Sequence, residues 1–193
     1  VIAFTKAHPA VKLNIFYKTM EELMSMLEKR ELDFVLSFKP SSVHPAIESH
    51  VLFDNNLSVI VNRYHPLAEK EKITLQDILP HGIAMPAKGL QSRNEFDKLY
   101  PSAYNQMKVR MELNEVNVLL DIVRGSSLIT ILSEAVIHQT NGLVAIPFDV
   151  PDNIMVGCVH TERGAYRKKA AEEFIRMLQE SEAVRERAIQ WLE

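Results

Sequence analysis

The sequence predicts an α/β fold built as two similar halves, and three observations support this prediction. Short apolar or alternating runs typical of strands are interleaved with amphipathic runs typical of helices along the whole chain. The helical run 23–31 separates the strand-like segments 11–17 and 32–38, which is the pattern of a β-α-β unit with a right-handed crossover. With 193 residues, 47% of them hydrophobic and 24% charged, the chain can bury a core without disulfides or metals.

Turn and stop signals divide the chain into its elements. A helix at the start ends before Pro9, because the residue preceding a proline is pushed out of the α region. Asp54-Asn55-Asn56 is a turn signal, Pro80 closes a short helix, and Gly125 ends another. We expect strands at residues 11–17, 32–38, 51–53, 57–61, 81–86, 107–113, 127–132, 143–148 and 154–160. We expect helices at residues 1–7, 23–31, 74–79, 91–100, 115–124 and 166–189.

The order of these elements predicts a chain that passes twice between two lobes. The first half lacks a final helix to cover its sheet, and the last helix follows the final strand of the second half. The last helix can therefore pack on the sheet of the first half. Strands 57–61 and 154–160 are the expected crossovers, and two adjacent extended segments can act as a hinge. We expect one lobe to hold residues 1–62 and 159–193, and the other residues 63–158.

Composition excludes several classes of function. The chain has 22 Lys+Arg against 25 Asp+Glu, which gives a net charge of −3, and its basic residues are scattered along the sequence. This distribution argues against direct binding of nucleic acid by this chain. No apolar run reaches the roughly 20 residues of a spanning helix, and the first residues lack a signal-peptide layout. The single Cys158 excludes an internal disulfide and favours a reducing compartment. We therefore expect a cytoplasmic protein that does not enter a membrane.

The residue types needed for catalysis or metal binding do not occur at diagnostic spacings. The seven histidines include no i, i+4 pair and no H-E-x-x-H pattern, so no metal site is expected. Gly125-Ser126-Ser127 differs from the nucleophile elbow of hydrolases. Asp33 and Asp121 lie beside apolar runs, yet neither has a second group at a spacing typical of general base catalysis. We expect no catalytic residue, no metal and no cofactor.

Two segments fit the capping-box pattern S/T-x-x-E at the start of a helix. They are Thr19 with Glu22 and Ser92 with Glu95, and each follows a predicted strand. A capping box stabilises a helix start by on the order of 1 kcal/mol. Helix starts beyond the carboxyl ends of strands are also where open α/β sheets bind ligands. We therefore expect both helix starts to face one ligand.

The loop PAKGLQS, residues 86–92, is the strongest candidate for an anion site. Gly89 allows close approach of the backbone to a ligand, and Lys88 adds a positive charge beside a helix start. The P-loop pattern of phosphate-binding enzymes is absent. An ordinary surface loop with an exposed lysine fits these residues equally well.

The order of several segments resembles the effector-binding domain of bacterial LysR-type transcriptional regulators over essentially the whole chain. The matching segments are HPAVKLNI (8–15), ELDFVLSF (31–38), VLFDNNLSVIVNRYHPLA (51–68), ITLQDIL (73–79), a G-L-x-S-R loop (89–93) and LNEVNVLLDIVRGSSLITILSEAV (113–136). One departure is Gly125-Ser126-Ser127-Leu128-Ile129, where the family often has a G-L-G-I pattern.

The resemblance implies a type II periplasmic-binding-protein-like fold with a small anionic effector in the cleft between two Rossmann-like lobes. It implies DNA binding only through an N-terminal winged helix-turn-helix domain outside this chain, with the first strand of the effector domain preceding Val1. It also implies a homodimer or homotetramer in which helix 1–7 of one subunit pairs with helix 115–124 of another. The implied effector contacts are Lys18, Thr19, Met20, Phe38, Lys39, Pro86, Ala87, Lys88, Gly89, Leu90, Gln91, Ser92, Thr130 and Ile131.

Two other classes of function remain open for such a fold. A transport-type solute-binding protein is the first alternative, and an enzyme is the second. A winged-helix segment upstream would indicate the regulator, a secretion signal the transporter, and turnover of a bound ligand the enzyme.

Overall fold

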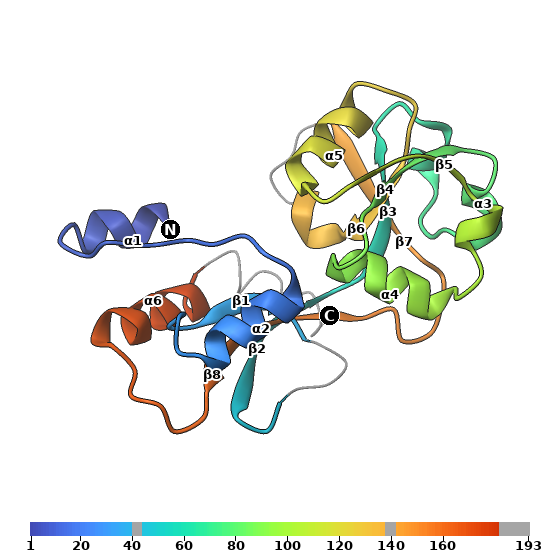
Figure 1. Cartoon of the computed structure of the whole chain (residues 1–193). Coiled ribbons are helices and arrows are strands. Elements are labelled where there is room, and N and C mark those ends of the chain that lie inside the picture. Colours follow the sequence, from blue (N-terminus) through green and yellow to red (C-terminus); the bar gives the residue numbers. More distant parts are fainter. Residues whose placement is uncertain (40–43, 138–141, 182–193) are drawn as a thin grey trace. The chain divides into compact units, whose positions relative to one another are not determined.

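The computed structural model describes residues 1–39, 44–137 and 142–181, which form two compact units (Figure 1). The first unit holds Val1–Asp54 and the chain from Val156 onward, and the second holds Asn55–Met155. Our sequence-based boundaries, 62/63 and 158/159, fall later along the chain. The difference arises because strand β3 (Leu57–Asn62) pairs with strands of the second unit, whereas β8 (Met155–Glu162) pairs with strands of the first.

The first unit is a three-stranded sheet in the order β1-β8-β2 with helices packed on it. Strands β1 and β8 run antiparallel, with Val35 opposite His160. Leu27 of α2 is buried against Val35 and Ile47, which fixes α2 on the sheet. Its elements are α1 (Ile2–Ala7), α2 (Met20–Glu28), β1 (Val35–Phe38), β2 (Ile47–Asn55), β8 and α6 (Lys169–Gln179).

Helices α1 and α6 are joined by aromatic contacts. The Phe174 ring lies 5.0 Å from the Phe4 ring and 5.3 Å from the Phe34 ring, measured between centroids. Helix α6 begins three residues later than the expected helix 166–189, and the part of that helix from residue 182 on lies outside the described residues.

Two predictions for the first unit are wrong. Residues 11–17 form no strand and pair with no strand among the described residues, and the side chain of Tyr17 is 94% exposed. Their alternating pattern is therefore that of an extended surface segment, and β1 pairs antiparallel with β8 instead of closing a parallel β-α-β unit. The turn expected at residues 54–56 is also absent, because β2 reaches Asn55, β3 starts at Leu57, and the two strands belong to different sheets.

The second unit contains a mixed sheet whose elements match the sequence prediction closely. Strand β3 runs antiparallel to both β6 and β7, while β4 and β5 are parallel. A bridge between Ile83 and Ile129 joins the two groups, which gives the order β5-β4-β6-β3-β7. Its remaining elements are η1 (Pro66–Glu69), α3 (Leu75–Ile78), β4 (Gly82–Pro86), α4 (Gln91–Leu99), η2 (Tyr104–Gln106), β5 (Lys108–Leu113), α5 (Val116–Arg124), β6 (Thr130–Ser133), η3 (Glu134–Ile137) and β7 (Leu143–Pro147).

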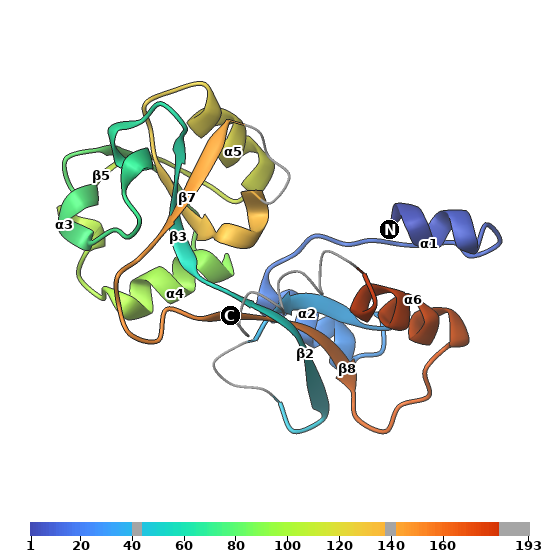
Figure 2. The ribbon, with the colours of Figure 1, turned by 180° about the vertical axis from the view of Figure 1, so that it is seen from behind.

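Helices α4 and α5 flank this sheet (Figures 1 and 2). The apolar stripe of α5 packs on the strands through Leu119, Leu120 and Val123, which lie in one buried cluster with Ile60 and Ala84. Burial of leucine and valine side chains of this size stabilises a fold by about 1.5–3 kcal/mol each. The stripe is therefore part of the core, and α5 ends at Gly125 as expected.

The start of α3 contains a carboxylate that gives the second unit a pH-dependent stability. The Asp77 carboxylate accepts a hydrogen bond from the Thr74 N–H at 2.8 Å and forms an ion pair with Lys70 at 2.8 Å. The Lys70 ammonium and then the Thr74 N–H lower the pKa of Asp77 to about 2. Because the carboxylate is stabilised in the folded chain, its contribution is complete above its ordinary pKa and is lost as pH falls toward 2.

We expect Asp77→Asn to lower the free energy of unfolding by about 1 kcal/mol at pH 7, since the solvent-screened ion pair is lost. The difference between variant and wild type should shrink as pH falls from 5 to 2. Urea unfolding at pH 7, 5 and 3 measures it. A difference that stays constant over this range would show that the Asp77 charge contributes nothing.

Candidate functional site

The loop after β4 is shaped by a tight turn at Gly89. The Ala87 N–H donates to the Leu113 carbonyl at 2.8 Å, which continues the β4–β5 pairing one residue past the strand. The Leu90 N–H then donates to the Ala87 carbonyl at 3.2 Å. Gly89 has φ of +95°, a left-handed conformation that side chains rarely adopt. Helix α4 begins directly after this turn.

Helix α4 starts without a capping side chain. Its N-cap is Leu90, which makes no side-chain hydrogen bond to the first turn. The expected capping box of Ser92 with Glu95 is wrong, because the turn at Gly89 starts the helix at Gln91 and places both residues inside it. There the Glu95 carboxylate accepts from the Gln91 side chain at 3.0 Å. The first-turn N–H groups of α4 are therefore not used by a cap.

The other long helix of the second unit and α2 of the first unit are capped. Glu115 accepts the Asn117 N–H at the start of α5 at 3.0 Å. Thr19 and Glu22 form the predicted capping box, with the Thr19 N–H donating to Glu22 at 3.0 Å. The start of α4 therefore differs from the starts of α2 and α5 in having no cap. Lys88, which precedes it in the chain, is exposed and makes no ion pair with any described residue.

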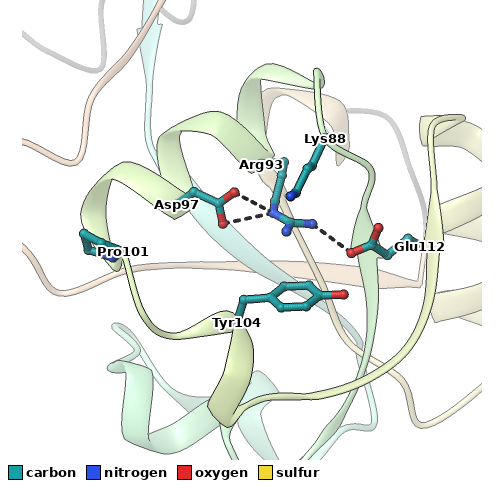
Figure 3. Close-up of a pocket in the computed structure, with 6 residues that line it drawn as sticks. All are labelled: Lys88, Arg93, Asp97, Pro101, Tyr104 and Glu112. Atoms are coloured by element: carbon teal, nitrogen blue, oxygen red, sulfur yellow. Dashed lines mark hydrogen bonds and ion pairs between the residues drawn. The ribbon is translucent and has the colours of Figure 1, made fainter.

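Next to Lys88 is a surface pocket of about 360 Å³ lined by charged and aromatic side chains (Figure 3). Its wall contains Arg93, whose side chain is 2% exposed. The Arg93 Nε lies 2.9 Å from each carboxylate oxygen of Asp97, and Nη1 lies 3.1 Å from Glu112 Oε1. The guanidinium carbon lies 4.5 Å from the centre of the Tyr104 ring. The pocket is lined by Lys88, Arg93, Asp97, Pro101, Tyr104 and Glu112.

The groups of this pocket shift one another's pKa in the directions expected of ionised partners. Hydrogen bonds from Tyr104 and then Arg93 lower the pKa of Glu112. The same bond to Glu112 raises the pKa of Tyr104. Burial acts to lower the pKa of Arg93, but hydrogen bonds to Glu112 and Asp97 outweigh it and the pKa is raised. Arg93 is therefore a permanent buried cation with two carboxylate partners.

In the first unit, the predicted contacts gather where α2 starts and β1 ends. The Ser37 hydroxyl donates to the Met20 sulfur at 3.4 Å, which joins these two places directly. Lys18 forms an ion pair with Glu22 at 3.1 Å. The Phe38 ring packs edge-on against Phe53, with centroids 6.5 Å apart. The Lys39 N–H donates to the Val156 carbonyl at 2.7 Å, and the residue is exposed.

Thr130 and Ile131 lie on β6 inside the sheet of the second unit, and both are 0% exposed. The Thr130 hydroxyl has no hydrogen-bond partner in the described part of the chain. A ligand reaches neither side chain in this conformation. Residues 86–92 thus form one continuous segment from the end of β4 to the first turn of α4, whereas Thr130 and Ile131 lie in the core.

Sequence reasoning missed the role of Arg93. The residue stands in the G-L-x-S-R loop, and the i, i+4 spacing of Arg93 and Asp97 on a predicted helix is a signal for an ion pair. Its burial follows from the contact with Glu112 on β5, which lies 19 residues further along the chain.

The fold is that of the type II periplasmic-binding-protein class. A family model described as "LysR substrate binding domain" matches residues 1–183. The chain therefore belongs to the LysR substrate-binding-domain family, as its sequence resemblance indicated.

Curated relatives in this family are transcriptional regulators. The chain is 24% identical over 138 residues to the malolactic fermentation system transcriptional activator of Lactococcus lactis, covering 70% of this chain and 47% of that protein. It is 25% identical over 185 residues to the RuBisCO operon transcriptional regulator of Allochromatium vinosum, covering 90% and 61%. The chain thus spans about half of the length of the curated relatives that it matches.

Solved structures show the same fold. The regulatory domain of CcmR from Synechocystis PCC6803 in complex with 2-PG has a TM-score of 0.76 and 21% identity, covering 92% of this chain and 86% of that one. The effector-binding domain of QuiR in complex with shikimate has a TM-score of 0.71 and 20% identity, covering 96% and 87%. The family model favours the regulator over the transport protein. Within the described residues, every helix is too short or too polar to cross a membrane.

Proposed function

We propose that this chain is the effector-sensing domain of a LysR-type transcriptional regulator and that it binds a small anionic metabolite without catalysing a reaction. The observation that carries the proposal is the start of α4, where an uncapped helix follows the turn at Gly89 beside the exposed cation Lys88. Free N–H groups and the positive end of a helix dipole favour an anion at such a place.

The proposed anion contacts in the second unit are residues 86–92. In the first unit we propose Lys18, Thr19, Met20, Phe38 and Lys39, which lie where α2 starts and β1 ends. We also retain Thr130 and Ile131 as proposed contacts, reached by a ligand only when the packing around β6 opens. A ligand that favours one arrangement of the two units shifts the population of that arrangement, and this is how a regulator can respond without breaking a bond.

In the full-length protein, we propose, DNA is bound by a domain outside this chain, in a cytoplasmic homodimer or homotetramer. A solved structure supports this view, because full-length CbnR was crystallised in complex with its target DNA. That structure has a TM-score of 0.68 and 13% identity, and the match covers 93% of this chain and 65% of that one.

The proposal is tested by titrating the chain with shikimate, 2-PG and inorganic phosphate while amide signals are followed by NMR. At least one anion should shift the amides of Gly89 to Arg93, the turn and first helical turn. Native mass spectrometry of the freshly purified chain would identify an anion carried from the cell. If anions shift only amides elsewhere, the site is not at α4.

We expect Lys88→Gln to weaken binding of the anion about fivefold, because a surface charge beside a helix start contributes about 1 kcal/mol. Lys98→Gln is the matched control, since Lys98 is exposed on the same helix but faces Glu95 at 3.5 Å. This control should change the affinity less than twofold. Equal losses in the two variants would mean that only the overall charge of the chain matters.

A further inference from the structure

The loop 86–92 is closed across its base by one side chain. Arg93 lies in the first turn of α4, and its Nη1 donates to the carbonyl of Pro86, the last residue of β4, at 3.2 Å. This hydrogen bond spans seven residues and brings the two ends of the loop together. The bond is buried, so water does not compete for it.

The same guanidinium attaches the loop to two further elements. Its Nη1 also contacts Glu112 of β5, and its Nε contacts Asp97 one turn along α4. The backbone adds a parallel connection, because Ala87 donates to the carbonyl of Leu113, the residue after Glu112. Loop, helix and strand thus share a single buried cation, with Tyr104 stacked on its face (Figure 3).

This set of contacts needs the fork of an arginine. A guanidinium presents several donors in one plane, so it can reach two carboxylates and a carbonyl together, whereas an ammonium is a compact charge with a different geometry. Arg93 itself is too buried to meet a ligand, which leaves Lys88 as the cation that faces solvent.

We propose that Arg93 is the positioning residue of the anion site: by closing the loop 86–92, it holds Lys88 and the first-turn N–H groups of α4 in place before a ligand arrives. This inference rests on the proposed function for its ligand, but its structural part concerns the free chain. Preorganisation of this kind raises affinity because less ordering remains to be done on binding.

The test is amide hydrogen exchange in the whole ligand-free chain, comparing wild type with Arg93→Lys. The amides of Ala87 and Leu90 should exchange at least tenfold faster in the variant, since their hydrogen bonds define the loop. The amides of β3 in the same sheet should change less than threefold. Arg176→Lys is a matched control, because Arg176 also contacts two carboxylates, Glu173 and Glu180, in the other unit.

Phe96→Leu provides the comparison for a purely structural effect, since Phe96 is buried on the same helix. It should speed exchange at Ala87, Leu90 and Tyr100 together, since the N–H of Tyr100, the C-cap of α4, donates to the Phe96 carbonyl. If Arg93→Lys gives this same uniform pattern, or leaves Ala87 and Leu90 unchanged, the positioning role is overturned.

A titration with inorganic phosphate separates this proposal from the proposed function. Arg93→Lys should weaken any phosphate binding seen at Gly89 to Arg93 at least fivefold, although Arg93 is not itself exposed. If wild-type amides do not respond to phosphate, shikimate or 2-PG, the anion site fails, while the exchange rates still decide whether Arg93 closes the loop. If phosphate binds both chains equally, Arg93 does not position the site.

Discussion

Replacement of Asn153 by alanine is expected to lower the free energy of unfolding by about 3 kcal/mol, because it removes the side-chain acceptor of the buried Leu57 N–H and two further buried hydrogen bonds. The carbonyls of Leu57 and Phe148 each keep one backbone donor, the N–H of Phe148 and of Val150. The Asn153 side chain accepts the Leu57 N–H at 2.9 Å and donates to the carbonyls of Leu57 at 2.9 Å and Phe148 at 3.1 Å. Asn153 is 7% exposed, so water does not replace these bonds. The amide group ties the start of β3 to the segment that follows β7.

Denaturant unfolding of the wild type, Asn153→Ala, Asn153→Asp and Asn94→Ala measures this contribution. Asn94 is an exposed residue of α4, and its replacement should change stability by less than 0.5 kcal/mol, as is usual for surface positions. Asn153→Asp keeps an acceptor for Leu57 but loses both donors, so it should be at least as destabilising as alanine. A loss below 1 kcal/mol in both Asn153 variants would show that the backbone groups find other partners.

Asn153 also shows why part of the fold cannot be predicted from the sequence. The order of strands and helices in the second unit follows from apolar patterning, since β4 is a short buried run and α5 is an amphipathic run that ends at Gly125. Nothing in the local sequence around Asn153 indicates a partner 96 residues earlier. Pro151, two residues earlier, is a residue type that favours a break in the chain, but it does not indicate which side chain stabilises that break.

The errors in the first unit have a related cause. Residues 11–17 alternate like a strand, yet a strand needs a hydrogen-bonded neighbour, and pairing partners are not encoded in the alternation itself. The sequence likewise offered Ser92 and Glu95 as a capping box, although the positive φ of Gly89 moves the helix start to Gln91. The Thr19 box formed because no such turn precedes it.

The candidate site was predictable to the level of the loop. Lys88 and Gly89 are residue types that suit an anion near a helix start, and the structure leaves that helix start uncapped. The contacts of Arg93 that hold the loop were not predictable from the sequence. The burial of Arg93 depends on Glu112 and Tyr104, which come close to it only through the pairing of β4 with β5.

The second large effect is expected at Gly157, in the central strand β8 of the first unit. A Cβ atom added there would lie 2.5 to 2.9 Å from three atoms of the Phe53 ring. Contacts this short force the ring or the strand to move, and overpacking of this kind costs about 1–3 kcal/mol. We expect Gly157→Ala to lower the free energy of unfolding by about 3 kcal/mol, with Gly125→Ala as control, whose Cβ would meet only a backbone oxygen at 3.6 Å.

A double-mutant cycle with Phe53→Leu tests the cause. If the clash with the ring is responsible, Gly157→Ala should cost less than 1 kcal/mol in the Phe53→Leu background. A full loss in that background would instead place the strain in the backbone of β8. The displaced ring also packs against Phe38, the residue opposite Gly157 in the β1–β8 ladder and a proposed effector contact. Gly157 therefore leaves room for the Phe53 ring, and this ring in turn holds Phe38 in the position that the proposed site requires. We expect the amide signal of Phe38 to shift in Gly157→Ala but not in Gly125→Ala.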